Sequence, residues 1–544
     1  MTVIRSMVLV SDDPLSRERN AGAVQERFAE EIRRRGLEGE IAVHTISGIR
    51  CKTVSPLAIV YPEAAVYGPM RVEDVPLVVE EHLVRRRPVP ALMPPPHKFS
   101  GRLAWLPRRK GTLPAEQRVV LQRVGVIDPE SLDDYLAHEG YEALRRVLGT
   151  STPADVIDMV YKSGLQGRGG AGFPTGLKWR FVAGAKSKKK YVVCNADESE
   201  PGTFKDRTIL EGDPHSIVEA MTIAAFAVGA DEGYIYVRGE YRLAQARLRK
   251  AIRQARQAGF LGENILDSGF SFDIHVHSGA GAYICGEETA LLESLEGKRG
   301  EPRFRPPYPT TCGLWCKPTL VNNVETLANV PAITRNGWQW YRMFGTPGSP
   351  GTKVYTILGN VKRRGVIEVP LGITLREVIA IYGGGMEDGT RLKLAQTGGS
   401  SGSVVPASLQ DTPMDFNSYK QAGVSLGSGA LLICNEDTCV IDLARVLMNF
   451  FRVESCGKCT PCRVGTRRAH AILTRISRGQ GTMSDLDELE TIAEALATLS
   501  NCGLGTSASV PLRDILRHYR AEVEAHLRLK VCPAGVCAME GSRD

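Results

Sequence analysis

Residues 164–179 read GLQGRGGAGFPTGLKW, and this glycine-rich stretch decides how the middle of the chain folds. So many positions without side chains let backbone N–H groups approach an anion closely. Arg168 and Lys178 add positive charge, while Phe173 and Trp179 add flat apolar surface. The combination predicts a loop that binds a phosphate-bearing aromatic ligand; the alternative is a flexible surface loop. The glycines are Gly164, Gly167, Gly169, Gly170, Gly172 and Gly176.

Acidic and amide side chains gather in three segments downstream of this loop. Residues 194–207 read CNADESEPGTFKDR, residues 279–291 read GAGAYICGEETAL, and residues 317–326 read KPTLVNNVET. Carboxylates just past a strand lie where open α/β sheets bind ligands, and they can accept ribose hydroxyls. Taken alone, the first segment fits a solvated acidic turn equally well. The candidate cofactor-binding residues here are Asn195, Asp197, Glu198, Glu200, Tyr283, Gly286, Glu287, Glu288, Asn322, Asn323 and Thr326.

A cysteine motif lies nearer the C-terminus. Residues 454–463 read ESCGKCTPCR, which places Cys456, Cys459 and Cys462 in C-x2-C-x2-C spacing, and Cys502 follows forty residues later. Three thiolates in a turn and one remote thiolate suit the four corners of a [4Fe–4S] cluster. A structural zinc site more often uses two C-x2-C pairs. The spacing therefore predicts an iron–sulfur cluster, with zinc or unligated thiols as alternatives.

Strand and helix patterns divide the chain around these motifs. Strands alternate with helices in the middle of the chain, which favours a parallel, layered sheet. A proline- and arginine-rich stretch without acidic residues precedes it and is typical of a linker or of a strap on a partner protein. We expect a small α/β unit over 1–84, the connector and helices over 85–149, an α/β domain over 150–338, a mixed domain over 339–428, a helical bundle over 429–530 and a tail over 531–544.

Composition excludes several classes of protein. The 544 residues are 43% apolar and 24% charged, as in ordinary globular proteins, and the net charge of +7 is weak support for nucleic-acid binding. The longest apolar stretch is about half of what spans a bilayer, so we expect no direct membrane insertion. The start, MTVIRSMVLVSDD, lacks the apolar core of a signal peptide, which favours the cytoplasm. Thirteen scattered cysteines indicate metal or redox chemistry.

Together, these motifs resemble the FMN-containing, NADH-oxidising subunit of respiratory complex I and the diaphorase subunits of NAD-linked hydrogenases and formate dehydrogenases. The resemblance covers about residues 150–530 and extends to the β subunit of electron-bifurcating hydrogenases. It implies a multidomain α/β fold: a thioredoxin-like N-terminal domain, a Rossmann-like FMN domain, a β-grasp (ubiquitin-like) domain and a four-helix bundle that holds one [4Fe–4S] cluster.

The resemblance also implies roles for individual residues. The glycine loop from Gly167 to Gly176 would hold FMN, with Asn195, Asn322 and Asn323 nearby. Phe173 and Phe181 would flank the nicotinamide nucleotide. Contacts to its ribose and nicotinamide would come from Glu198, Glu200 and Glu288, with Glu287 close to the flavin.

Two further features bear on the nucleotide. The resemblance places Arg305 and Tyr308 on the adenine side, where complex I members commonly carry Lys and Phe, and the tyrosine would preserve a stacking face. A carboxylate beside the ribose 2′-OH repels a 2′-phosphate, which favours NADH over NADPH. Hydride would pass from nicotinamide to flavin, and electrons would then leave singly through the cluster, so no side chain is expected to act as nucleophile or general base.

The chain departs from the hydrogenase-type pattern at both ends. Cys51 alone stands where four cysteines would hold a [2Fe–2S] cluster, so we expect a structural or docking module. The sequence stops at Asp544, without a ferredoxin domain. Near that end, soft ligands cluster in a pattern that suits structural zinc, with free thiols as the alternative. The candidate zinc ligands are Cys439, His526, Cys532 and Cys537.

A further pair of cysteines, Cys312 and Cys316, flanks a Gly-Leu-Trp turn. We expect this pair to be buried thiols rather than metal ligands.

The leading functional hypothesis is a subunit of a soluble, hydrogenase-type NAD(H)-linked complex that includes electron-bifurcating members. Its partners would be a small iron–sulfur subunit and a larger catalytic subunit, with ferredoxin reached through a partner. The alternatives are the flavin subunit of a formate dehydrogenase or of complex I, and a non-catalytic electron-wire or scaffold subunit.

Overall fold

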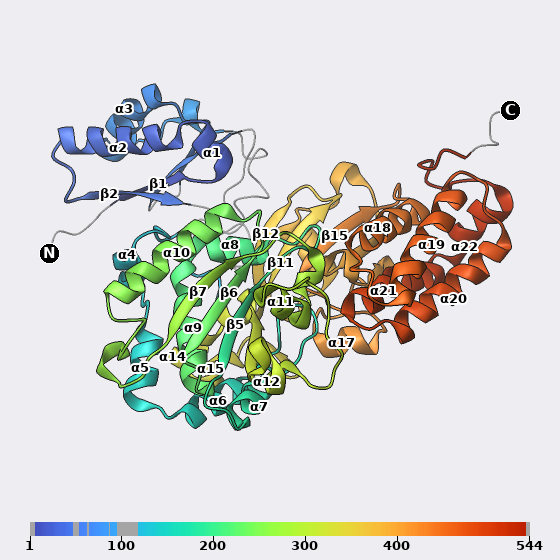
Figure 1. Ribbon diagram of the computed structural model, residues 1–544. Coiled ribbons are helices and arrows are strands. Elements are labelled where there is room, and N and C mark those ends of the chain that lie inside the picture. The colour runs from blue at the N-terminus through green and yellow to red at the C-terminus, as the bar shows by residue number, and fades with distance from the viewer. Residues whose placement is uncertain (1–5, 47–53, 62–64, 86, 95–117, 540–544) are drawn as a thin grey trace.

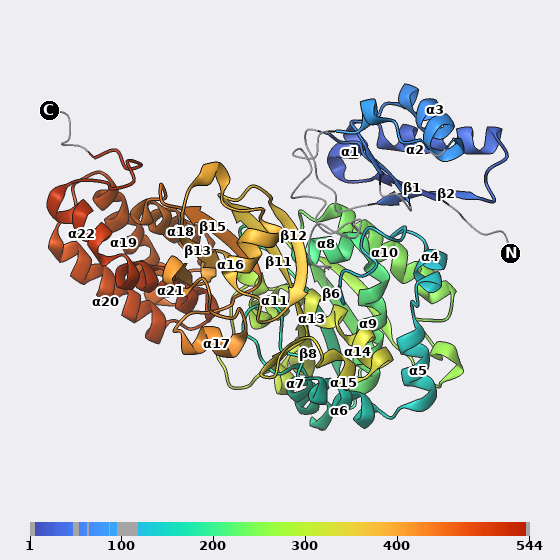
Figure 2. The ribbon, with the colours of Figure 1, turned by 180° about the vertical axis from the view of Figure 1, so that it is seen from behind.

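The computed structural model describes residues 6–46, 54–61, 65–85, 87–94 and 118–539. Cys51 and most of the proline-rich connector lie outside these residues. Figure 1 shows a small N-terminal unit beside a central α/β domain, and a helical bundle at the far end of the molecule. In Figure 2 a second, mixed sheet lies between the central domain and the bundle.

The N-terminal unit is a four-stranded sheet in the order β2-β1-β3-β4. Strands β1 (Ser6–Ser11) and β2 (Ile41–Ile46) are parallel, whereas β3 (Ala58–Tyr61) and β4 (Ala65–Tyr67) are antiparallel to their neighbours. Helix α2 (Ala21–Arg34) buries its apolar stripe against this sheet.

The central domain contains a parallel sheet in the order β7-β6-β5-β8, as the alternation of strands and helices predicts. Its strands are β5 (Tyr191–Ala196), β6 (Glu232–Val237), β7 (Asp273–Ser278) and β8 (Thr319–Asn323).

Helices surround this sheet. Helix α9 (Pro214–Val228) is buried along nearly its whole length because it packs inside the layers, and Gly229 ends it in the left-handed conformation. The others that matter here are α6 (Pro153–Ser163), α7 (Thr175–Gly184), α8 (Lys205–Gly212), α10 (Arg242–Gln257) and α11 (Glu288–Leu295).

The mixed domain has a five-stranded sheet in the order β12-β11-β15-β13-β14. Strand β15 pairs with β11 and β13, although it lies beyond the expected boundary at residue 428. The mixed domain therefore extends to residue 435, since the hydrogen bonds of β15 make it part of this sheet. The strands are β11 (Thr352–Gly359), β12 (Gly365–Pro370), β13 (Leu392–Thr397), β14 (Val404–Pro406) and β15 (Ala430–Asn435).

Four long helices form the C-terminal bundle. They share one core with Leu473, Leu489 and Leu512 at its centre. No helix among the described residues is both long enough and apolar enough to cross a bilayer. The bundle helices are α18 (Val440–Glu454), α19 (Thr460–Ser477), α20 (Met483–Leu499) and α21 (Gly503–His518).

Candidate functional site

Two adjoining cavities open at the carboxyl ends of β5 and β8. The first measures about 510 Å³ and the second about 580 Å³, sizes typical of ligand sites. All predicted cofactor-binding residues except Arg168 and Gly176 line at least one of them. The residues that line both are Gly169, Ala171, Asn195, Gly286, Glu287, Asn323 and Gly503.

The glycine loop is a closed loop rather than a flexible one. The Gly167 amide donates to Phe173 O at 2.9 Å, and the Thr175 amide donates to Leu165 O at 2.9 Å. At Gly172 the φ angle is +65°, and a Cβ would lie 2.7 Å from the Phe416 ring. A side chain there would therefore be both strained and obstructed.

The structure differs from the sequence prediction at Arg168. Its guanidinium is fully buried and donates to the backbone oxygens of Thr352 (3.1 Å) and Pro350 (3.0 Å), not into a cavity. Its amide donates to Thr326 Oγ1 at 2.8 Å. Arg168 therefore fastens the glycine loop to the mixed domain instead of offering charge to a ligand.

Gly176 also differs from the prediction, because it does not line either cavity. A Cβ at this position would lie 2.4 Å from Tyr161 Cα, so the glycine lets α7 approach α6 closely. Its contribution is to packing behind the loop.

Two neighbouring carboxyl groups after β5 differ in how they are satisfied. Glu198 accepts from the amides of Asp206 (2.9 Å) and Arg207 (3.0 Å) at the start of α8. Asp197 accepts from Ser199 Oγ at 3.0 Å, but its Oδ2 is buried without a hydrogen-bond partner among the described residues. Burial raises the pKa of each carboxyl to about 7. The free oxygen of Asp197, in a cavity wall, fits a polar group of a bound ligand.

Glu200 joins the central domain to the mixed domain. It accepts from Tyr283 Oη at 2.7 Å, from the Ser401 amide at 3.0 Å and from Ser401 Oγ at 2.7 Å. Burial raises the pKa of Glu200, and these donors oppose the rise. The first cavity is thus closed on one side by a contact between two domains.

At the mouth of the second cavity, charged and aromatic side chains alternate. Lys178 Nζ lies 3.0 Å from Glu288 Oε2, and Arg305 Nη1 lies 3.6 Å from Glu288 Oε1. The aromatic side chains at this mouth are substantially exposed, so they offer free faces for stacking a flat ring. They are Phe173, Phe181 and Tyr308.

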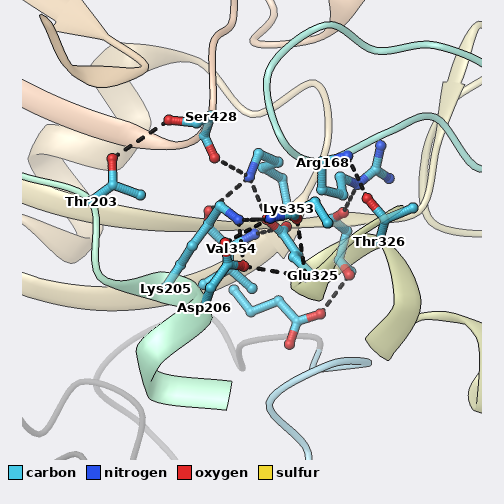
Figure 3. A network of polar contacts seen from close by, with 12 residues as sticks. Arg168, Thr203, Lys205, Asp206, Glu325, Thr326, Lys353, Val354 and Ser428 are labelled. Atoms are coloured by element: carbon cyan, nitrogen blue, oxygen red, sulfur yellow. Dashed lines mark hydrogen bonds and ion pairs between the residues drawn. The ribbon is translucent and has the colours of Figure 1, made fainter. Parts of the chain in front are cut away.

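A buried ion network lies beneath the first cavity (Figure 3). Lys205 Nζ lies 2.7 Å from Asp206 Oδ1 and 3.0 Å from Glu325 Oε2. Lys353 Nζ lies 2.6 Å from the same Glu325 oxygen and donates to Ser428 O at 2.7 Å. Burial lowers the pKa of Lys353 to about 8, and the two lysines hold the pKa of Glu325 below its usual value despite burial.

The network was not predicted from the sequence, although Lys205, Asp206 and Glu325 lie inside quoted segments. Lys353 lies outside them, and no local pattern links it to Glu325. Lys205, Asp206 and Ser428 also line the first cavity, so the network fixes part of its floor.

The four cysteines of the predicted cluster site belong to one packed cluster, and Cys456, Cys459 and Cys502 lie close enough to Cys462 for their charges to act on its thiol. Cys459 and Cys502 are the N-cap residues of α19 and α21, and Cys462 lies in the first turn of α19. Helix N-termini favour thiolates. Burial raises the pKa of the Cys462 thiol to about 11, and the other three thiols add to the rise. Three cysteines at helix N-termini and Cys456 in the loop before α19 fit the ligand set of a [4Fe–4S] cluster.

This cluster site borders the cavities directly. Gly503, which follows Cys502, lines both cavities. The Arg299 guanidinium donates to Cys456 O at 2.7 Å, and Lys458 Nζ donates to Pro302 O at 2.7 Å. The cysteine loop is therefore held against the central domain.

A second group of metal-type ligands lies beside the bundle. Cys439, His526, Cys532 and Cys537 have one ligand atom each within 4.8 Å of all the others. Cys439 Sγ lies 3.4 Å from His526 Nε2, while His526 Nδ1 lies 2.8 Å from Glu522 O. A backbone acceptor on the second ring nitrogen is a common way to orient a metal-binding histidine. All four candidates thus come together.

The structure corrects the prediction for Cys312 and Cys316. They form a disulfide rather than two buried thiols, and Cys316 is exposed. The remaining cysteines with free thiols outside the two metal groups, among the described residues, are buried: Cys194, Cys285 and Cys434.

The fold and these sites define a multidomain flavin and iron–sulfur oxidoreductase subunit. Comparison with known proteins agrees. The Nuo51 FMN-binding domain matches residues 160–332, the NADH-ubiquinone oxidoreductase-F iron-sulfur binding region matches 442–526, and the SLBB domain matches 354–405.

Relatives and solved structures give the same result. The NADP-reducing hydrogenase subunit HndC of Solidesulfovibrio fructosivorans is 51% identical over 77% of this chain and 85% of its own. An NADH-quinone oxidoreductase subunit of Rhizobium meliloti (strain 1021) is 48% identical over 76% of this chain and 99% of its own. An NAD+-reducing [NiFe]-hydrogenase in the H2-reduced state superposes with a TM-score of 0.68 at 30% identity, covering 96% of this chain and 84% of that one.

The chain therefore belongs to the family of NADH-binding, FMN- and [4Fe–4S]-containing subunits shared by complex I and NAD-linked hydrogenases. It is an oxidoreductase subunit that transfers electrons from NADH through its iron–sulfur cluster to partner subunits.

Proposed function

We propose that FMN binds where the two cavities adjoin, against the residues that line both, and that NADH enters through the mouth of the second cavity. The observation that carries this proposal is the common lining: the glycine loop, Asn195 and Glu287 face both cavities, and Gly503 places the cluster ligand Cys502 beside them. When bound, FMN accepts hydride from the nicotinamide and delivers electrons one at a time. The residues of this chain bind and orient the cofactor and the nucleotide, and they exclude water.

Each group of side chains has a distinct part in this arrangement. Asn322 and Asn323 lie near the flavin phosphate, with Lys178 as the nearby cation. Phe173, Phe181 and Tyr308 stack on the nucleotide. Glu200 and Glu288 accept from its hydroxyl and amide groups, and Glu287 lies close to the flavin. Glu198 acts indirectly, because its oxygens are engaged at the start of α8.

The preferred nucleotide is NADH. Glu288 at the mouth disfavours a 2′-phosphate by charge repulsion, although Lys178 and Arg305 compensate part of that charge. Anaerobic titration of the holoprotein with NADH, and in parallel with NADPH, tests both the placement of the cofactors and the preference for NADH. We expect flavin bleaching at stoichiometric NADH, followed by the cluster's electron-paramagnetic signal, and weaker bleaching with NADPH. Absence of bleaching with both nucleotides would refute the site.

We propose a hydrogenase-type complex as the setting, with a small iron–sulfur subunit and a larger catalytic subunit as partners. The NAD+-reducing hydrogenase likeness extends over 96% of the chain, including the N-terminal unit. A complex I setting is the second candidate, supported by the Rhizobium relative. Purification of the native complex, followed by assays of hydrogen oxidation and quinone reduction, distinguishes the two.

We further propose the finer domain assignments: a thioredoxin-like docking module over the N-terminal unit, a Rossmann-like FMN domain, a β-grasp domain around β11–β15 and a four-helix cluster domain. The group of Cys439, His526, Cys532 and Cys537 would hold zinc, which ties the C-terminal tail to the start of the bundle. Metal ligation by so many thiolates favours a reducing compartment such as the cytoplasm.

A further inference from the structure

A disulfide-closed turn lies next to the mouth of the second cavity. Helix α12 (Pro309–Cys312) ends at Cys312, and a 3-10 turn (Leu314–Cys316) follows Gly313. The bond between Cys312 and Cys316 joins the ends of these two short elements. The N-terminal side of this turn includes or adjoins residues that line the second cavity: Tyr308, Pro309 and Thr310.

The backbone of this turn is unfavourable for the residues it carries. Trp315 has φ +46° and Cys316 has φ +56°, both in the left-handed region that favours glycine. A non-glycine residue there costs roughly 1 kcal/mol or more. A glycine at 316 would remove that cost, so the cysteine is explained by the chemistry of its sulfur rather than by the shape of the turn.

The bond is also placed where small thiols can reach it. Cys316 is exposed, in contrast to the buried thiols of Cys194, Cys285 and Cys434. Exposed disulfides are the ones most readily exchanged, and disulfides in reducing compartments are mostly transient or redox-sensing.

The two halves of the turn are anchored differently. On the C-terminal side, the Trp315 amide donates to Glu296 Oε1 at 2.8 Å, and the Trp315 ring packs on Tyr191 at 5.3 Å between centroids. The Arg303 guanidinium donates to Gly313 O at 2.7 Å. By contrast, α12 is a single helical turn without a side-chain cap, and it is held by packing against α7 and β8. The disulfide adds a covalent tie between this turn, which begins next to Tyr308, and the half that is anchored by hydrogen bonds.

We propose that the Cys312–Cys316 disulfide is a reversible thiol–disulfide modification site that sets the affinity for the nicotinamide nucleotide. The inference rests on the proposed placement of that nucleotide at Tyr308. A thiol reductant attacks the S–S bond by exchange: the disulfide and two R–SH molecules give two cysteine thiols and one R–S–S–R. Two electrons and two protons thus pass to the cysteines. In the reduced form α12 loses its tie, and the Tyr308 ring is held less firmly.

The redox state of the pair can be measured without any nucleotide. Holoprotein would be equilibrated anaerobically in glutathione buffers of graded ratio, quenched in acid and labelled with N-ethylmaleimide. Mass spectrometry would then follow the tryptic peptide that contains both cysteines. We expect no label on this peptide at the oxidised end, two labels at the reduced end, and a reversible transition between them. Two labels at every ratio would overturn the proposal.

Stopped-flow reduction of the flavin by NADH would test the link to nucleotide affinity in the same samples. We expect the half-saturating NADH concentration to be about fivefold or more higher in the reduced form, in the range of typical couplings between sites. In Cys316→Gly and Cys312→Ser variants, this dependence on redox state should vanish, while Cys434→Ala should keep it. Equal NADH dependence of the two forms would overturn the link. Absence of flavin reduction in both forms would instead refute the proposed function, and the labelling result would stand.

Discussion

The Lys178 ammonium lies 3.0 Å from the Glu288 carboxylate, so this acidic group at the cavity mouth is already partly neutralised before a nucleotide arrives. Both side chains are about one-quarter exposed. In the proposed site Glu288 combines this ion pair with an acceptor for the nucleotide, so a change at this position should affect binding more than the chemistry of hydride transfer.

Glu288→Gln should raise the KM for NADH about 10- to 100-fold with little change in kcat, because a hydrogen bond to a charged group contributes about 1.5–3 kcal/mol. Steady-state kinetics with a one-electron acceptor measure this. Glu293→Gln, on the same helix but paired with Arg303 away from the cavities, serves as the control. A fall in kcat with unchanged KM would contradict the assigned role.

Cys459→Ala should remove the [4Fe–4S] cluster while flavin reduction by NADH persists. Cys459 caps α19, and a cubane cluster needs its fourth thiolate. Iron analysis should fall from about four atoms per chain, and the electron-paramagnetic signal should disappear. Cys434→Ala, a buried cysteine of β15, should change neither. A normal cluster signal in Cys459→Ala would show that another residue is the ligand.

Cys532→Ala should abolish zinc binding, since only three ligands of the group would remain. Metal analysis of the parent protein should give about one zinc per chain in addition to iron. The variant should lose zinc and keep iron. Retention of zinc in Cys532→Ala, or its absence from the parent protein, would exclude this group as a zinc site.

Lys353→Met should destabilise the fold by about 3–5 kcal/mol, because it leaves the buried Glu325 with one cation fewer. Chemical denaturation followed by tryptophan fluorescence measures the change. Lys250→Met removes a partly exposed partner of Glu130 and should cost about 1 kcal/mol or less. Similar costs for both variants would mean that the network in Figure 3 is not a centre of stability.

The pH dependence of stability should carry a contribution from Asp197. Its pKa is raised by burial from 3.8 to about 7, so the folded state binds the proton more tightly than the unfolded state. The stabilisation is complete below the unfolded value and is lost as pH rises through the folded value. Between about pH 5.5 and about pH 7.5, the urea midpoint of Asp197→Asn should fall less than that of the parent protein. Glu198 acts in the same direction, so some slope should remain. An unchanged slope in the variant would contradict this assignment.

Local patterns singled out most of the residues that line the two cavities because these residues are concentrated in a few short segments. The glycine loop, the amides of 322–323 and the C-x2-C-x2-C motif each indicate their chemistry by spacing. The grouping of Cys439 with His526, Cys532 and Cys537 was also predicted, and the structure brings them together.

What sequence could not supply were long-range partners. Arg168 looked like a ligand-binding cation, but its guanidinium donates to the carbonyls of Thr352 and Pro350, more than 180 residues away in sequence, which no local pattern encodes. The Glu325–Lys353 pair and the last strand of the mixed sheet depend likewise on pairing across the fold. The disulfide was missed because the expected compartment is reducing.

The position of Gly503 has a consequence for how fast electrons can tunnel. Tunnelling rates fall exponentially with the gap between donor and acceptor. Cys502 and Gly503 both belong to the bundle, at the start of α21, whereas the glycine loop of the proposed flavin site belongs to the central domain. The gap between flavin and cluster is therefore set by how the bundle packs against the central domain, and a change that loosens this packing should slow internal electron transfer.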